Sequence, residues 1–139
     1  MKLINHENKV FRLSISEYML PFKPDNYFGN NWLKGDIEIS FNKTKQHIEL
    51  ETLQIEELIN LRDWIDQLIN KTTRSETIFD FIDPRMRFRI WKRGHRELLK
   101  FIFHSESKSI YSWDLILNDE NLQAFTNQIQ ETLIKFPIR

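Results

Sequence analysis

Short segments in which apolar and polar residues alternate recur along this chain, and they constrain its fold more than any other feature. In the first of them Phe11, Leu13 and Ile15 share one face, while polar residues occupy the other. An apolar side chain at every second position is typical of a strand that buries one face. We expect a sheet of about six strands, drawn from residues 10–18, 36–41, 47–50, 77–82, 86–91, 98–104 and 110–115.

Two longer segments have the periodicity of amphipathic helices. Thr52 can cap a helix that continues to about Asn70, and Asn118 or Asp119 can cap a second one that ends before Pro137. The apolar face of the first helix comprises Ile55, Leu58, Leu61, Ile65, Leu68 and Ile69. Short turns between successive strands favour antiparallel pairing. The sequence therefore predicts an α+β fold, with a mostly antiparallel sheet and two amphipathic helices packed on one face, in a single domain of residues 1–139.

Composition excludes several classes of protein. Lys plus Arg equals Asp plus Glu at 20 each, so no global charge attracts nucleic acid or an anionic membrane. The absence of cysteine removes disulfides, thiolate zinc sites and cysteine nucleophiles. No apolar run approaches the ~18 residues of a membrane-spanning helix, and the first residues contain no signal-peptide core. We therefore expect a cytoplasmic protein without a membrane partner.

The sequence contains no pattern of catalytic or ligand-binding residues. No two of the histidines, His6, His47, His95 and His104, have the spacing of metal ligands on a helix. Three glycines cannot build a phosphate-binding loop, and no serine has the context of a nucleophile elbow. We predict no enzyme activity, no catalytic, cofactor-binding or metal-binding residue, and no small-molecule substrate.

Acidic residues gather on the polar face of the first helix. Glu56, Asp63 and Asp66 lie there, and Trp64 is expected at the edge of that face. Proteins that block nucleases often present acidic surface to a basic active-site cleft, which speeds their encounter. These four residues are our candidates for partner binding. The alternative is an ordinary solvated helix face.

Basic residues gather in the hairpin from Arg85 to Lys100, which also contains Trp91. Such a hairpin could hold nucleic-acid phosphates. It could equally be the polar face of an antiparallel hairpin, and the zero net charge and the lack of aromatic residues between the cations favour that interpretation. Nucleic acid is therefore not the expected partner.

An aromatic segment from Asp25 to Leu33 precedes the second strand. Tyr27, Phe28 and Trp32 surround Gly29 in it. Aromatic side chains at such a position either recognise a partner or close one end of the core. We expect chiefly the second role.

Several of these segments resemble one family in their order and spacing. Residues 26–33, Asn-Tyr-Phe-Gly-Asn-Asn-Trp-Leu, resemble the Tyr-Trp-Asp-x-Asn-Trp-Leu segment of WapI-type immunity proteins. Residues 81–84, Phe-Ile-Asp-Pro, resemble the Phe-x-Glu-Pro turn of that family. Residues 131–139 resemble its C-terminal end. The resemblance covers most of the chain.

This resemblance implies a small bacterial antitoxin of the cytoplasm. Such proteins are similar in role to contact-dependent immunity proteins, and each binds and blocks the toxic C-terminal domain of a polymorphic wall-associated toxin, often a nuclease. It implies stoichiometric binding without catalysis and fixes no contact residue, because immunity interfaces vary with the toxin. The alternatives are a nucleic-acid-binding module that uses the Arg85–Lys100 hairpin and a protein-interaction domain of another kind.

Overall fold

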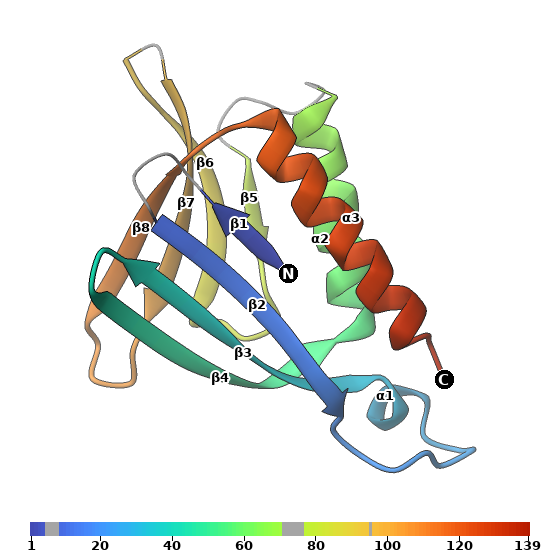
Figure 1. Cartoon of the computed structure of the whole chain (residues 1–139). Coiled ribbons are helices and arrows are strands. Elements are labelled where there is room, and N and C mark those ends of the chain that lie inside the picture. The colour runs from blue at the N-terminus through green and yellow to red at the C-terminus, as the bar shows by residue number, and fades with distance from the viewer. Residues whose placement is uncertain (5–8, 71–76, 95) are drawn as a thin grey trace.

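Two antiparallel sheets and two long helices enclose the core of the molecule (Figure 1). The structure is a computed structural model that describes residues 1–4, 9–70, 77–94 and 96–139. Both sheets contain four strands in sequence order, β1-β2-β3-β4 and β5-β6-β7-β8. The chain passes from the first sheet to the second through helix α2.

The first sheet is a meander of long strands. Its strands are β1 (Lys2–Ile4), β2 (Lys9–Tyr18), β3 (Trp32–Phe41) and β4 (Thr44–Gln54). Register shifts occur between Ile15 and Glu17 and between Leu33 and Gly35. At Gly35 the two irregularities meet, and a Cβ there would lie 2.2 Å from the Ser14 carbonyl oxygen. The close approach of β2 and β3 therefore requires glycine at this position.

The second sheet is a meander of hairpins. Its strands are β5 (Ile78–Asp80), β6 (Met86–Arg93), β7 (Arg96–His104) and β8 (Ile110–Ile116). In-register pairs such as Phe88 with Phe101 place aromatic residues of β6 and β7 side by side. Gly94 lies in the β6–β7 turn with φ 63°, a conformation that glycine adopts without strain.

Helix α2 (Ile55–Ile69) begins three residues later than the expected Thr52 cap. Thr52 is still in the extended strand β4, because Leu53 and Gln54 pair with β3. The cap is Gln54, whose N–H donates to Oε2 of Glu57 over 2.8 Å. Helix α3 (Asp119–Lys135) is capped by Asn118, as the sequence indicates, and Arg62 of α2 reaches Gln130 of α3 over 2.7 Å.

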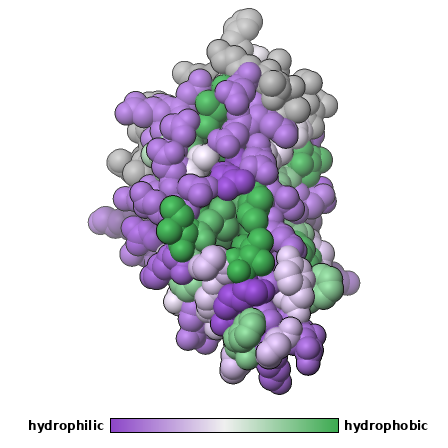
Figure 2. Space-filling view, turned by 90° about the vertical axis from the view of Figure 1, so that its right-hand side faces the viewer, coloured by the Kyte–Doolittle hydropathy of each residue, from purple (hydrophilic) through white to green (hydrophobic). Residues whose placement is uncertain are grey.

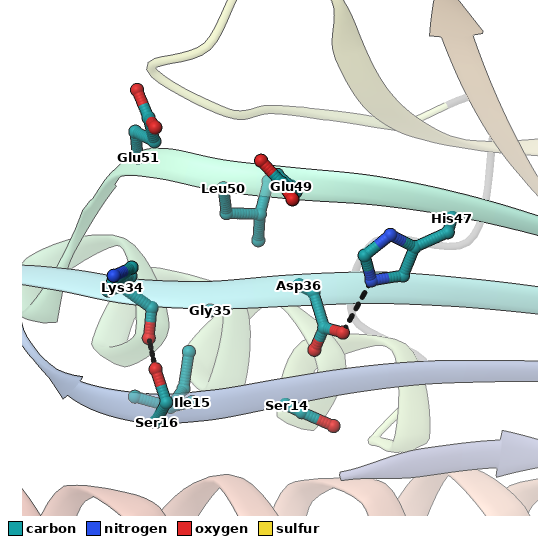
Figure 3. A pocket seen from close by; sticks show the side chains of 10 residues that line it. All are labelled: Ser14, Ile15, Ser16, Lys34, Gly35, Asp36, His47, Glu49, Leu50 and Glu51. Atoms are coloured by element: carbon teal, nitrogen blue, oxygen red, sulfur yellow. Dashed lines mark hydrogen bonds and ion pairs between the residues drawn. The ribbon is translucent and has the colours of Figure 1, made fainter.

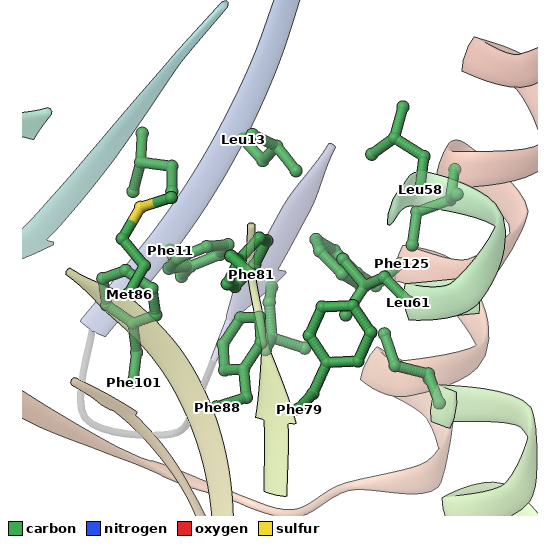
Figure 4. Close-up of a cluster of buried hydrophobic side chains, with 14 of the residues drawn as sticks. Phe11, Leu13, Leu58, Leu61, Phe79, Phe81, Met86, Phe88, Phe101 and Phe125 are labelled. Carbon is green, nitrogen blue, oxygen red and sulfur yellow. The ribbon is translucent and has the colours of Figure 1, made fainter. Parts of the chain in front are cut away.

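The two sheets and α3 share one aromatic core (Figure 4). The ring of Phe11 on β2 lies 5.2 Å from Phe88 and 5.0 Å from Phe101 of the second sheet, and 6.2 Å from Phe125 of α3. All four side chains are almost fully buried. Edge-to-face contacts of this kind add to the hydrophobic stabilisation of burial.

The α+β class is confirmed, but the arrangement of its elements differs from the expectation. There are two sheets instead of one, with eight strands in the described ranges, and three helices instead of two. Sequence periodicity identifies strands without saying which of them pair. Strand β1 has three residues and helix α1 (Tyr27–Asn30) has four, so both are too short to produce a periodic pattern.

Candidate functional site

Three of the four candidate partner-binding residues lie on the accessible side of α2. Glu56 and Asp66 are half-buried and Asp63 is exposed. Because residues 56, 63 and 66 project from nearby directions of one helix, they form a single stripe, which we call the helix surface. Arg62 donates to Oδ1 of Asp63 from two nitrogens at 3.0 and 3.1 Å. Glu56 and Asp66 therefore carry most of the uncompensated negative charge of this stripe.

Trp64, the fourth candidate, lies in the core. Its side chain is 8% exposed, and its Nε1–H donates to Oγ1 of Thr77 over 2.9 Å. Its ring stacks on Phe88 at 6.2 Å. Residue 64 falls three positions after Leu61 and four before Leu68, on the buried face of α2. Trp64 therefore offers a partner almost no surface.

The aromatic segment does not close the core as expected. Phe28 is 68% exposed and Tyr27 is 49% exposed, whereas Asn30 and Asn31 are buried. The interior of the loop is polar because these amides satisfy backbone groups, and the rings are turned outward. Asn30 accepts from the Lys23 N–H over 2.7 Å and donates to the Lys23 carbonyl over 2.6 Å.

Arg139 fastens this loop to the end of α3. Its backbone N–H donates to Oδ1 of Asn31 over 2.8 Å, and its guanidinium donates to the Asn30 and Leu20 carbonyls at 3.0 and 2.8 Å. The guanidinium carbon also lies 3.7 Å above the Tyr18 ring. Sequence reasoning assigned no role to Arg139, because its contacts are more than a hundred residues distant along the chain.

A second acidic surface lies on the outer face of the first sheet (Figure 3). This hollow, which we call the sheet groove, has a volume of about 490 Å³. It is lined by residues of three strands, Ser14, Ile15, Ser16, Lys34, Gly35, Asp36, His47, Glu49, Leu50 and Glu51. Figure 3 shows Asp36 and His47 pointing toward one another, and His47 Nε2 lies 2.7 Å from Oδ2 of Asp36. Among the described residues, no cation lies within ion-pair distance of Glu49 or Glu51.

The sheet groove continues into a second hollow of about 300 Å³ at the second sheet. The two share Glu49 and Glu51, and the second adds Thr52, Asp83, Arg85 and Glu106. Arg85 donates to Oδ2 of Asp83 over 2.7 Å, and this bond holds the pKa of Asp83 below its usual value. The sequence analysis missed this surface. The alternation of Glu49 and Glu51 with the buried Ile48 and Leu50 could have indicated it, because it places both carboxylates on the outer face of β4.

Acidic neighbours compensate several cations of the Arg85–Lys100 hairpin. Arg87 pairs with Asp80 at 3.0 Å, and Lys100 lies 3.7 Å from Asp114. Lys100 also lies 4.4 Å above the Trp91 ring. Cations held this way are less available to phosphate groups than free ones.

The described ranges contain neither a metal-binding cluster nor a helix that could span a membrane. Within residues 1–4, 9–70, 77–94 and 96–139, no three His, Cys, Asp or Glu side chains are arranged to hold a metal ion. In the same ranges no helix combines the length and apolar character needed to cross a membrane.

Comparison with known proteins agrees with the resemblance noted in the sequence. No curated protein matches this chain. The model of the immunity protein WapI-like family matches residues 2–137, which is nearly the whole length. The matched range contains both sheets, α2 and α3, and the aromatic segment. The chain therefore belongs to the immunity protein WapI-like family.

Proposed function

We propose that this chain is a bacterial immunity protein that binds and neutralises the toxic C-terminal domain of a cognate polymorphic toxin. The observation that carries this proposal is the family match over residues 2–137. The protein acts as a stoichiometric inhibitor in the cytoplasm and catalyses no reaction. A nuclease is the toxic domain that we propose, because the basic cleft in which a nuclease holds phosphate groups would be complementary to the acidic surfaces of this chain.

The toxin contact includes Glu56, Asp63 and Asp66 of the helix surface. Carboxylates on a helix stay in fixed positions, so they can match cations of a partner without the entropic cost of ordering a loop. Their charge also raises the rate at which a basic partner arrives. Asp63 contributes least, since Arg62 lies 3.0 Å from its carboxylate.

The sheet groove is the competing acidic surface, and it provides a matched control. Glu56→Lys with Asp66→Lys changes the net charge as much as Glu49→Lys with Glu51→Lys, so long-range attraction falls equally in both double variants. A difference in Kd between the two double variants therefore reports the loss of direct contacts with the toxin domain. The helix double variant should bind the toxin domain at least about 10-fold more weakly than the groove double variant.

The experiment first identifies the partner by function. Candidate toxin domains are co-expressed with the chain, and a domain whose lethality the chain abolishes is purified. Titration calorimetry then measures the stoichiometry and the Kd of the wild-type chain and both double variants. A one-to-one complex weakened by the helix variant supports the proposal, whereas equal Kd values for the two variants remove the helix surface as the contact.

The same chain can be tested for nucleic-acid binding, the alternative function of the Arg85–Lys100 hairpin. Filter binding at low salt should retain neither RNA nor DNA, because Arg87 and Lys100 have acidic neighbours. Retention that falls steeply with salt would favour the alternative.

A further inference from the structure

Exposed apolar side chains concentrate in the loop between β2 and β3. Of the twelve exposed large apolar side chains in the described ranges, five belong to residues 19–28. They are Met19, Leu20, Phe22, Tyr27 and Phe28. Figure 2 views the side on which Figure 1 places α2 and α3, and a separate group of apolar residues lies in the middle of that face, above the level of α1 in Figure 1. Apolar surface concentrated in this way marks sites of protein association more often than isolated exposed residues do.

The two most prominent rings stand on a rigid base. The Asn26 side chain caps α1 by accepting from the Gly29 N–H over 2.9 Å, and a Cβ on Gly29 would lie 2.1 Å from the Asn26 side chain. Asn31 donates to the Tyr27 carbonyl over 2.7 Å. The Tyr27 and Phe28 rings meet edge to face at 5.7 Å. A surface fixed before binding loses little conformational entropy when a partner arrives.

Negative charge borders this apolar surface at Tyr27, whereas the Arg139 guanidinium lies 5.8 Å from the ring of Phe22, another member of the surface. The Tyr27 hydroxyl donates to Oε1 of Glu56 over 2.8 Å, so the rings lie directly beside the helix surface. An apolar centre with a charged border has the anatomy of a protein interface, in which buried aromatic anchors supply most of the affinity. The matching partner has an apolar pocket for the two rings and a cation opposite Glu56.

This charge pattern also distinguishes between two occupants. The Tyr27–Glu56 bond makes the rings continuous with the helix surface, so a symmetric pair of identical chains would bring two acidic helix surfaces close to one interface, where their negative charges repel. A basic toxin domain meets the opposite charge instead. We propose that Tyr27 and Phe28 are the apolar anchor by which this chain holds the toxin domain, with Glu56 at its border. This inference rests on the proposed function and names the part of the interface that supplies affinity.

Phe28→Ala tests the anchor in the full chain. Phe28 is 68% exposed, so its removal should leave the melting temperature unchanged while weakening binding of the purified toxin domain at least about 10-fold. Ile110→Ala is the matched control, because Ile110 is 65% exposed on β8 of the second sheet. It should change the Kd by less than about 2-fold.

Three outcomes would overturn the anchor. Phe28→Ala could bind like the wild type while the Glu56→Lys with Asp66→Lys variant binds weakly, which would leave the proposed function intact. Sedimentation could show a dimer of the chain that Phe28→Ala dissociates, which would make a second copy the occupant. The wild type could neutralise no toxin domain, in which case the proposed function fails first.

Discussion

The hydroxyl of Tyr27 donates a 2.8 Å hydrogen bond to Oε1 of Glu56, and this contact joins the aromatic segment to the helix surface on α2. Two segments that are separate in the sequence thereby become one surface. The bond also raises the pKa of Tyr27, because loss of the phenol proton would break it and place a second negative charge beside Glu56.

The Tyr27 titration tests this link. In Glu56→Ala the pKa of Tyr27 should fall toward its ordinary value, because both the bond and the neighbouring charge are gone. NMR of ring-labelled tyrosine follows the transition. Asp63→Ala is the control, since Asp63 bonds to Arg62 instead, and it should leave the Tyr27 titration unchanged. An unaltered Tyr27 pKa in Glu56→Ala would contradict the link.

Asn31 should contribute strongly to stability although it lies in a loop. Its side chain donates to the Tyr27 carbonyl and accepts from the Arg139 N–H, and it is 4% exposed. Asn31→Ala should lower the free energy of unfolding by about 2 kcal/mol, because buried polar groups lose their partners. Urea unfolding measures this, with the exposed Asn60→Ala as control. A loss no larger than that of the control would show that the loop is not fastened as described.

Glu57 should make stability fall as the pH rises. Burial raises the pKa of its carboxyl above the ordinary 4.5, although the N–H groups of Ile82 and Gln54 oppose this. A raised folded-state pKa contributes stability that is complete below the unfolded value of 4.5 and is lost as the pH rises through the folded value.

Urea unfolding of the wild type and Glu57→Gln across this window isolates the contribution of Glu57. The stability difference, wild type minus variant, should shrink as the pH increases from 4.5 toward neutrality. Asp83 does not mimic this trend, since Arg85 lowers its pKa and its contribution disappears as the pH falls. A stability difference that grows with pH would show that the pKa of Glu57 is lowered in the folded protein instead of raised.

Gly35 should tolerate no side chain. A Cβ there would lie 2.2 Å from the Ser14 carbonyl oxygen, so Gly35→Ala must push β2 away from β3. We expect a loss of about 2 kcal/mol or more in the free energy of unfolding. Gly94→Asn is the control, because no atom lies within 4 Å of a Cβ at Gly94 and asparagine accepts its positive φ. Similar losses in both variants would contradict the steric explanation.

The sequence predicted local structure well because burial follows simple periods. Phe11 and Leu13 are buried as their alternation indicated, and Leu58 and Leu61 face the core of α2 as helical spacing required. The division into two sheets was not predicted, because periodicity carries no information on pairing. That division depends on where α2 interrupts the strands.

The candidate site was predicted less well than the fold, because its residues were assigned to the surface or the core from the polarity of the sequence alone. Trp64 was placed at a surface edge, but its ring fills the space between α2 and Phe88. Tyr27 and Phe28 were expected inside, yet the buried amides of Asn30 and Asn31 take that position. Contacts that bridge a hundred residues, such as the bond between Arg139 and Asn31, leave no trace in a local pattern.

Carboxyl footprinting of the toxin complex tests the central claim most directly, because one sample reports both acidic surfaces. A carbodiimide labels accessible carboxylates of the free chain and of the complex, and mass spectrometry quantifies each site. Labelling of Glu56 and Asp66 should fall several-fold in the complex, while labelling of Glu49 and Glu51 should stay constant. Protection of Glu49 and Glu51 with unchanged labelling of Glu56 and Asp66 would contradict the claim and move the toxin contact to the sheet groove.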